Sequence, residues 1–136
     1  MQNQAIKLIE SYYSAFNRGD MQTFFNLMDE KVIHDINQGE RQVGKPTFQK
    51  FMEHMNHCYR EKITDLVIFA NSEETRAAAE FVVEGTYIAT DKGFPAATQQ
   101  TYRIAAGAFF SIQSGKISRV TNYYNVKEWV KLISQS

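Results

Sequence analysis

Apolar residues recur every three or four positions in the first part of the chain, which is the spacing of amphipathic helices. The pattern predicts a first helix over about residues 3–17, a short second helix after Asp20, and a third that begins at Pro46 and ends near Cys58 or Tyr59. Gly19 suits the C-terminal cap of the first helix, and Asp20 suits the N-cap of the second. The apolar positions of the three helices are Ile6, Ile9, Tyr13 and Phe16; Phe24, Phe25, Leu27 and Met28; and Phe48, Phe51, Met52 and Met55.

The apolar period shortens to two residues after about Glu61, and this alternation is typical of half-buried strands. A shorter strand precedes the third helix, around Asp35, and a polar loop follows it between Gly39 and Gly44. Helices followed by long strands predict an α+β fold, in which the helices pack on one face of a curved antiparallel sheet. The later segments are a strand from Glu61 to a turn at 71–74, a long strand over Thr75–Thr90, a loop at 91–95, strands over Gln99–Gln113 and Lys116–Asn125 joined by a Ser114-Gly115 turn, and a helix over Val126–Ile133.

The composition fits a single domain over residues 1–136 with one hydrophobic core. Hydrophobic residues make up 43% of the chain, and 17 of its 18 aromatic residues are Phe or Tyr, which suits a large core or an apolar cavity. The 15 Lys and Arg residues balance the 15 Asp and Glu residues, so no net charge attracts nucleic acid or an anionic membrane. There is one cysteine, no secretory signal, and no apolar run near the ~18 residues of a membrane span. We therefore expect a cytoplasmic protein without a nucleic-acid or membrane partner.

Asp35 is the first candidate for a catalytic residue, because it lies in an apolar, strand-like run, Val32–Gly39. Burial of such a strand would remove water from the carboxylate and raise its pKa, so that it could accept a proton near neutral pH. The alternative is a structural Asp at a strand end, which is bonded to nearby backbone amides and has a lowered pKa.

Several motifs resemble those of the nuclear-transport-factor-2-like superfamily, and the similarity is strongest to its ketosteroid-isomerase-related and SnoaL-like members. The motifs are the segment Tyr12–Asp20, the Asp35 strand, the Gly44-Lys45 start of the third helix and the Ser114–Ile117 hairpin. The resemblance implies a cone-shaped α+β barrel, in which a bent sheet wraps around the N-terminal helices and encloses an apolar pocket. It also implies a homodimer that pairs through the sheet. Isomerases, cyclases, dehydratases, epoxide hydrolases and non-enzymes share this scaffold, so the fold does not identify the reaction.

The resemblance assigns two catalytic residues. The tyrosine that holds the enolate oxygen in ketosteroid isomerase matches Tyr12, and the aspartate base matches Asp35 if one residue is deleted before the strand. The position of the third group, a protonated acid, falls near Ala108, and the strand over Gln99–Gln113 contains no carboxylate. Loss of such a donor costs roughly 3–4 kcal/mol of transition-state stabilisation. We therefore do not expect an orthodox steroid isomerase.

His34, Asn37 and Gln38 are candidate substrate-binding residues next to Asp35. Adjacent residues of a strand point to opposite faces, so His34 faces away from the pocket if Asp35 faces it, unless a bulge intervenes. Its alternative role is structural or interfacial. Asn37 and Gln38 suit the rim of a cavity, where they would orient a substrate carbonyl, and they equally suit backbone capping in a loop.

No metal site and no cofactor are expected. Glu53 and His57 share one helix face, and His54 and His57, three residues apart, can also share one. Zinc sites need three or four ligands, however, and Cys58 lies off the face of Glu53 and His57. Neither a phosphate-binding glycine loop nor a nucleophile elbow occurs in the sequence.

The leading hypothesis is cofactor-independent acid–base chemistry on a small hydrophobic carbonyl compound, with Asp35 as the base and Tyr12 as the donor to the developing oxyanion. The competing hypothesis is a ligand-binding or dimerisation module that keeps the pocket without the reaction. The two differ at Asp35, because a base needs a raised pKa and a side chain that faces the cavity.

Overall fold

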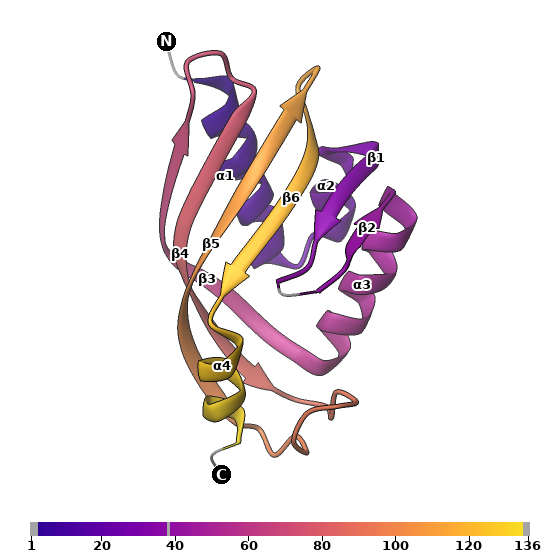
Figure 1. The fold of residues 1–136 in the computed structure, drawn as a ribbon, viewed down its shortest axis with the longest axis vertical. Coiled ribbons are helices and arrows are strands. Elements are labelled where there is room, and N and C mark those ends of the chain that lie inside the picture. Colours follow the sequence, from indigo (N-terminus) through magenta and orange to yellow (C-terminus); the bar gives the residue numbers. More distant parts are fainter. Residues whose placement is uncertain (1–2, 38, 135–136) are drawn as a thin grey trace.

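A bent sheet wraps around the first helix in this computed structural model, which describes residues 3–37 and 39–134 (Figure 1). The expected α+β fold, with helices against one face of a curved sheet, is confirmed. The helices are α1 (Gln4–Arg18), α2 (Met21–Asn26), α3 (Lys45–Cys58) and α4 (Val126–Ile133). The strands are β1 (Met28–Asp35), β2 (Arg41–Val43), β3 (Tyr59–Ala70), β4 (Arg76–Tyr87), β5 (Thr101–Gln113) and β6 (Lys116–Tyr124).

The six strands lie in the order β2-β1-β6-β5-β4-β3. All neighbouring pairs are antiparallel except β1 and β6, which run parallel with Asp35 opposite Thr121. The sheet is therefore mixed, and the prediction of an antiparallel sheet is wrong for this one pair. The sequence pattern predicted a polar loop where β2 forms. Three residues are too few to display an alternating pattern, and β2 exists because it pairs with the edge of β1.

Side-chain and glycine caps explain why the ends of the first helices could be predicted. The Asn3 side chain accepts hydrogen bonds from the backbone N–H groups of Ala5 and Ile6, at 2.9 and 3.2 Å. Gly19 ends α1 in the left-handed region, at φ 71°, and the Asp20 carboxylate then accepts from the backbone of Thr23 at 3.1 Å. None of the helices in the described ranges has the length and apolarity that a membrane crossing requires.

A bulge in β3 changes which residues face the helices. The register with β4 shifts between Thr64 and Val67, and Asp65 has a positive φ of 52°. Ile63 is buried, and after the extra residue Val67 and Phe69 are exposed. Strict alternation along the sequence would put Ile63, Val67 and Phe69 on one side of the strand, and the bulge turns Val67 and Phe69 to the other side.

The side-chain amide of Asn17 satisfies the free edge of β3 near this bulge. Its Nδ2 donates to the carbonyl of Ile63 at 3.0 Å, and its Oδ1 accepts from the N–H of Ile63 at 2.8 Å. Asn17 therefore replaces the hydrogen bonds of a missing neighbouring strand and ties α1 to the sheet.

Two clusters of buried residues form the interior. The larger one lies between α1, α2, α3 and the sheet, and includes Ile9, Phe24, Phe48, Phe110 and Val120. The smaller one lies under α4 and consists of Cys58, Tyr59, Tyr87, Tyr102, Ile104, Trp129 and Ile133. Both clusters contribute side chains to one cavity.

Candidate functional site

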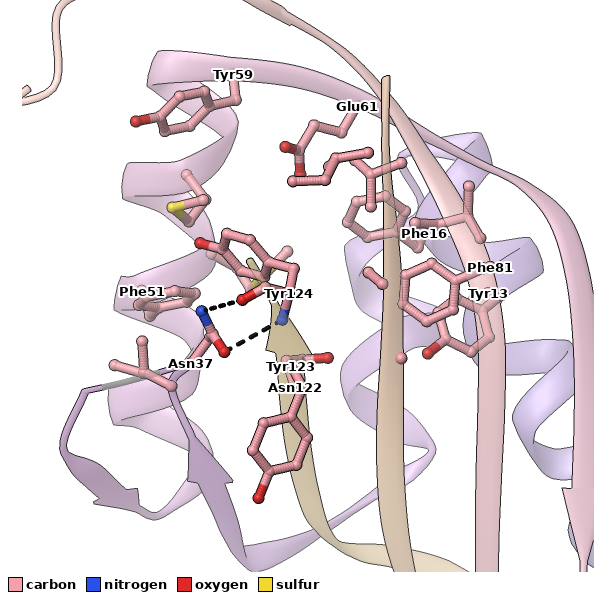
Figure 2. A pocket seen from close by; sticks show the side chains of 18 of the residues that line it. Tyr13, Phe16, Asn37, Phe51, Tyr59, Glu61, Phe81, Asn122, Tyr123 and Tyr124 are labelled. Carbon is pink, nitrogen blue, oxygen red and sulfur yellow. Dashed lines mark hydrogen bonds between the residues drawn. The ribbon is translucent and has the colours of Figure 1, made fainter. Parts of the chain in front are cut away.

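A cavity of about 160 Å³ lies between the concave face of the sheet and the helices (Figure 2). An enclosed apolar cavity of about 150 Å³ is large enough to bind benzene, so this one has room for at least one ring. Phe, Met, Ile and Val side chains form much of its wall. The polar side chains that line it include Tyr12, Tyr13, Tyr59, Tyr102, Tyr124, His34, Asn37, Asn56, Asn122 and Glu61.

Glu61 brings the one carboxyl among the described residues of the cavity wall. It projects from β3 toward the aromatic side chains of the cavity (Figure 2). Burial raises the pKa of Glu61 above its ordinary value, because the charged form loses water, while the hydrogen bond that Tyr102 donates acts in the opposite direction. A carboxylate with a raised pKa is a stronger base than an ordinary carboxylate, which suits it to proton transfer.

Gly85 makes the contact between Tyr102 and Glu61 possible. Glu61 on β3 lies opposite Gly85 on β4, and Gly85 lies opposite Tyr102 on β5. The Tyr102 ring lies across β4 above Gly85, where a Cβ atom would approach its Cζ to 2.3 Å. Any side chain at position 85 would therefore displace the ring from the carboxyl.

Aromatic residues of β3, β6 and α4 surround this pair. The Trp129 ring packs edge-on against Tyr102, with 6.1 Å between centroids, and at 5.5 Å from Tyr59. Burial raises the pKa values of Tyr59, Tyr102 and Tyr124, so all three phenols are protonated at neutral pH. Tyr59 donates to Asp91 outside the cavity, at 2.8 Å.

Tyr12 and Tyr13 of α1 form another part of the wall. Both are buried, and burial raises their pKa values, so both stay protonated. Within the described ranges, the Tyr13 hydroxyl is the one buried side-chain polar atom without a hydrogen-bond partner. An unsatisfied buried hydroxyl costs about 1–3 kcal/mol, and an oxygen of a ligand in the cavity would relieve this cost.

Asp35 faces away from the cavity and His34 faces into it, which is the reverse of the expected arrangement. Asp35 points to the outer face of the sheet, where Arg41 donates to both of its carboxylate oxygens at 2.7 and 3.1 Å and Thr121 donates at 2.7 Å. The Arg41 guanidinium, above all, holds the pKa of Asp35 below its ordinary value. The prediction that Asp35 faces the cavity with a raised pKa is therefore wrong, because the pleat turns its neighbour inward instead.

His34 is the residue of this strand that lines the cavity, and it is 2% exposed. Its ring stacks on Phe48 with 4.0 Å between centroids, and its Nδ1 lies 3.3 Å from the Oε1 of Gln42. Burial lowers the pKa of His34, so the imidazole is neutral at neutral pH. A neutral imidazole can donate or accept one hydrogen bond without placing a charge in the cavity.

Asn37 lines the cavity, but its amide is engaged with the backbone of β6. It donates to the carbonyl of Tyr124 at 3.0 Å and accepts from the N–H of the same residue at 3.2 Å (Figure 2). The structure therefore gives Asn37 the capping role that the sequence left open. Gln38, the other loop candidate, lies outside the described residues.

Glu61 was not among the residues predicted from the sequence. Its neighbours Arg60 and Lys62 are charged, and the segment resembles a solvent-exposed strand end. A usable signal was present, because Glu61 lies two residues from both Tyr59 and Ile63. These two residues are buried, and alternate residues of a strand share a face.

Comparisons with known proteins agree with the resemblance predicted from the motifs. The model of the SnoaL-like domain family matches residues 9–120. A candidate polyketide cyclase from Pseudomonas putida is 57% identical, with a TM-score of 0.94 over 95% of this chain and 97% of that one. Another from Xanthomonas campestris is 48% identical, with a TM-score of 0.94 over 96% of each chain.

More distant structures share the fold alone. An epoxide hydrolase from Mycobacterium tuberculosis is 15% identical, with a TM-score of 0.74 over 97% of this chain and 86% of that one. No curated protein matches the sequence.

The raised pKa of Glu61 should make the free energy of unfolding depend on pH. As pH rises above the ordinary value of 4.5, Glu61 ionises in the unfolded chain before it ionises in the folded protein. The wild-type protein should therefore lose stability relative to Glu61→Gln until the pH passes the folded-state pKa, and the difference should then stay constant. Urea unfolding of both proteins between pH 4 and 8 measures it, with Glu10→Gln, an exposed carboxyl on α1, as the control. A difference that does not change with pH would contradict the prediction.

A second prediction concerns Gly85→Ala. The added methyl group collides with the Tyr102 ring, so we expect a loss of about 1–3 kcal/mol in the free energy of unfolding, as for other overpacked sites. The control is Gly107→Ala, whose Cβ would meet nothing nearer than the carbonyl of Ala79 at 3.4 Å. Adding Tyr102→Ala to Gly85→Ala should remove most of the extra cost, which a double-mutant cycle measures. Equal losses in the free energy of unfolding for Gly85→Ala and Gly107→Ala would contradict a collision with the Tyr102 ring.

Proposed function

The chain belongs to the SnoaL-like domain family, and on that premise we propose that it catalyses cofactor-independent acid–base chemistry, of isomerase or cyclase type, on a small hydrophobic carbonyl compound. The observation that carries the proposal is the Glu61 carboxyl, which lies in an aromatic cavity with a raised pKa and a hydrogen bond from Tyr102. Two close structural neighbours are named as candidate polyketide cyclases, which supports a reaction of this kind.

In the proposed reaction, ionised Glu61 removes a proton from the carbon next to the substrate carbonyl. The electron pair of the broken C–H bond forms an enolate, and the negative charge collects on its oxygen. For an isomerase, protonated Glu61 returns the proton to another carbon of the same enolate. For a cyclase, the enolate carbon attacks a second carbonyl group of the same molecule, and the proton passes to the new alkoxide. Both reactions begin with the same step and need one carboxyl that shuttles a single proton.

The enolate oxygen needs hydrogen-bond donors that are in place before the reaction. Tyr12 and Tyr13 are protonated phenols on the cavity wall, and the Tyr13 hydroxyl lacks a partner within the described ranges. We propose that these two hydroxyls donate hydrogen bonds to the enolate oxygen. Removal of one such donor typically lowers the rate by 10²–10³-fold. His34 is assigned a further polar contact to the substrate, because its neutral ring lines the same cavity.

The assignment of Glu61 is tested with substitutions that remove one carboxyl at a time. A panel of one- and two-ring ketones and diketones is incubated with the protein in D₂O, and exchange at the carbon next to the carbonyl is followed by NMR. Glu61→Gln should lower the exchange rate by about 10²–10⁴-fold, whereas Asp35→Asn, the matched control on the outer face, should stay within a few-fold of wild type. The wild-type rate should rise with pH through the pKa of Glu61 and then level off.

Two outcomes would count against this assignment. Loss of exchange in Asp35→Asn with normal exchange in Glu61→Gln would indicate that Asp35, not Glu61, is the base. Ketone binding by the wild-type protein, with exchange no faster than in buffer, would favour a ligand-binding module.

We also propose that the protein forms a homodimer through the outer face of the sheet. Four large apolar side chains are exposed there on β3, β5 and β6: Val67 (47%), Phe69 (54%), Phe109 (49%) and Tyr123 (56%). Strand register places Val67 and Tyr123 in one row across the sheet and Phe69 and Phe109 in the next row of the same face. The rings of Phe109 and Tyr123 are in contact, with 5.8 Å between centroids, and the exposed carboxylate of Glu80 lies in the row between Val67 and Tyr123. Apolar side chains gathered on one exposed face mark interaction surfaces, and a second copy of the chain offers a matching surface.

Phe109→Glu tests the dimer, since it places a charge at the centre of this apolar surface. We expect light scattering to show a dimer for the wild-type protein and a dissociation constant at least about ten-fold weaker for the variant. Gln49→Glu adds the same charge at an exposed position of α3 and should leave the dimer unchanged. A monomeric wild-type protein, or identical behaviour of the two variants, would contradict the proposal.

A further inference from the structure

Three side chains with metal-binding atoms converge where α3 meets the loop between β4 and β5. They are His54, Cys58 and Asp91, and their ligand atoms all lie within 4.8 Å of one another. We propose that this cluster binds a divalent transition-metal ion, and that zinc is the ion its donor set fits best. This site is separate from the proposed catalytic carboxyl, and the proposal does not depend on the reaction.

The backbone brings the three residues together from two elements. His54 and Cys58 are four residues apart near the end of α3, so their side chains share one face of the helix. Asp91 follows β4 in the loop that leads to β5. His57, which its spacing pairs with Glu53 or His54, is not in the cluster.

The distances suit a small ion at the centre of the cluster. His54 Nε2 lies 2.8 Å from Asp91 Oδ1, and Cys58 Sγ lies 3.9 Å from the same Nε2. Metal–ligand bonds of about 2.0–2.3 Å in a tetrahedral zinc site place neighbouring ligand atoms roughly 3.3–3.8 Å apart. Shifts of about half an ångström would therefore complete the coordination.

The chemistry of the donors favours zinc over magnesium or calcium. A thiolate is a soft ligand and an imidazole is of intermediate softness, whereas magnesium and calcium select oxygen ligands. Three protein ligands leave a fourth position for water, as in many zinc sites. The His54 side chain is 53% exposed, which gives the ion a path from solvent.

Neighbouring groups hold the carboxylate in place. Tyr59 donates its hydroxyl hydrogen to Asp91 Oδ2 at 2.8 Å, so the other oxygen, Oδ1, is left to face His54. The backbone N–H of Asp91 donates to the Tyr87 hydroxyl at 2.8 Å, and Tyr87 in turn donates to the carbonyl of Pro95. Such outer contacts orient ligands in metal sites before the ion arrives.

The same three residue types also occur in cysteine-based catalytic triads, but this geometry differs. In a triad, the carboxylate binds one ring nitrogen of the histidine and the thiol faces the other. Here Asp91 and Cys58 both approach Nε2 of His54. Convergence of three donors on one point is the arrangement of metal ligands.

Cobalt and zinc titrations of the chelator-treated, full-length protein test the site. Cobalt should give the visible bands of a four-coordinate ion and a thiolate-to-cobalt charge-transfer band. Zinc should displace it, bind at one equivalent, and raise the melting temperature. Cys58→Ser should abolish the charge-transfer band, and His54→Gln or Asp91→Asn should weaken zinc binding by at least ten-fold. Tyr59→Phe, which removes an orienting contact, should weaken it by about 10–100-fold.

His57→Gln is the matched control, because it removes a histidine of the same helix that is not in the cluster, and it should bind zinc as the wild type does. Absence of the charge-transfer band in the wild-type protein would overturn the proposal, whatever the stability of the variants. Equal weakening by His57→Gln and His54→Gln would also overturn it. Ketone exchange is not part of this readout, so failure of the metal site leaves the role of Glu61 untouched.

Discussion

The carboxyl of Glu61 can lie inside an aromatic cavity because Tyr102 reaches it across Gly85. A carboxyl without any partner in such surroundings would lose its hydrogen bonds with water and gain none. The Tyr102 hydroxyl supplies one partner, and the raised pKa of Glu61 reduces the fraction that is charged. Three adjacent strands must therefore stay in register, since a shift of one residue would move Glu61, Gly85 or Tyr102 to the other face.

Two asparagine side chains hold the walls around this pair. Asn17 forms two hydrogen bonds with the backbone of Ile63, two residues beyond Glu61, and so joins α1 to the edge of β3. Asn37 forms the same pair of bonds with Tyr124 at the end of β6. Each amide imitates the peptide group of a neighbouring strand. The cavity is thus bounded by elements whose positions are set by hydrogen bonds as well as by apolar packing.

The sequence predicts the helices better than it predicts the faces of the strands. Asn3, Gly19 and Asp20 act locally, so their effect on the helix ends does not depend on distant parts of the chain. The orientation of β1 depends instead on its parallel pairing with β6, which brings Asp35 beside Thr121 and turns His34 inward. The bulge at Asp65 likewise has no counterpart in the hydrophobic pattern. The place of Asp91 beside α3 depends on the path of a loop far along the chain.

Asp35 and Glu61 show how two faces of one sheet give similar carboxyls opposite properties. Arg41 binds Asp35 on the outer face and lowers its pKa. Asp35 therefore stabilises the folded protein when the pH is above 3.8, the ordinary pKa of Asp, and this contribution is lost as the pH falls. Glu61 has a raised pKa on the inner face, so its contribution is fully present at low pH and is lost as the pH rises. The charge of Asp35 therefore stabilises the folded protein, whereas the charge of Glu61 destabilises it. A carboxylate whose charge is unfavourable in the folded protein gains most from accepting a proton, and this property supports the role of base that we propose for Glu61.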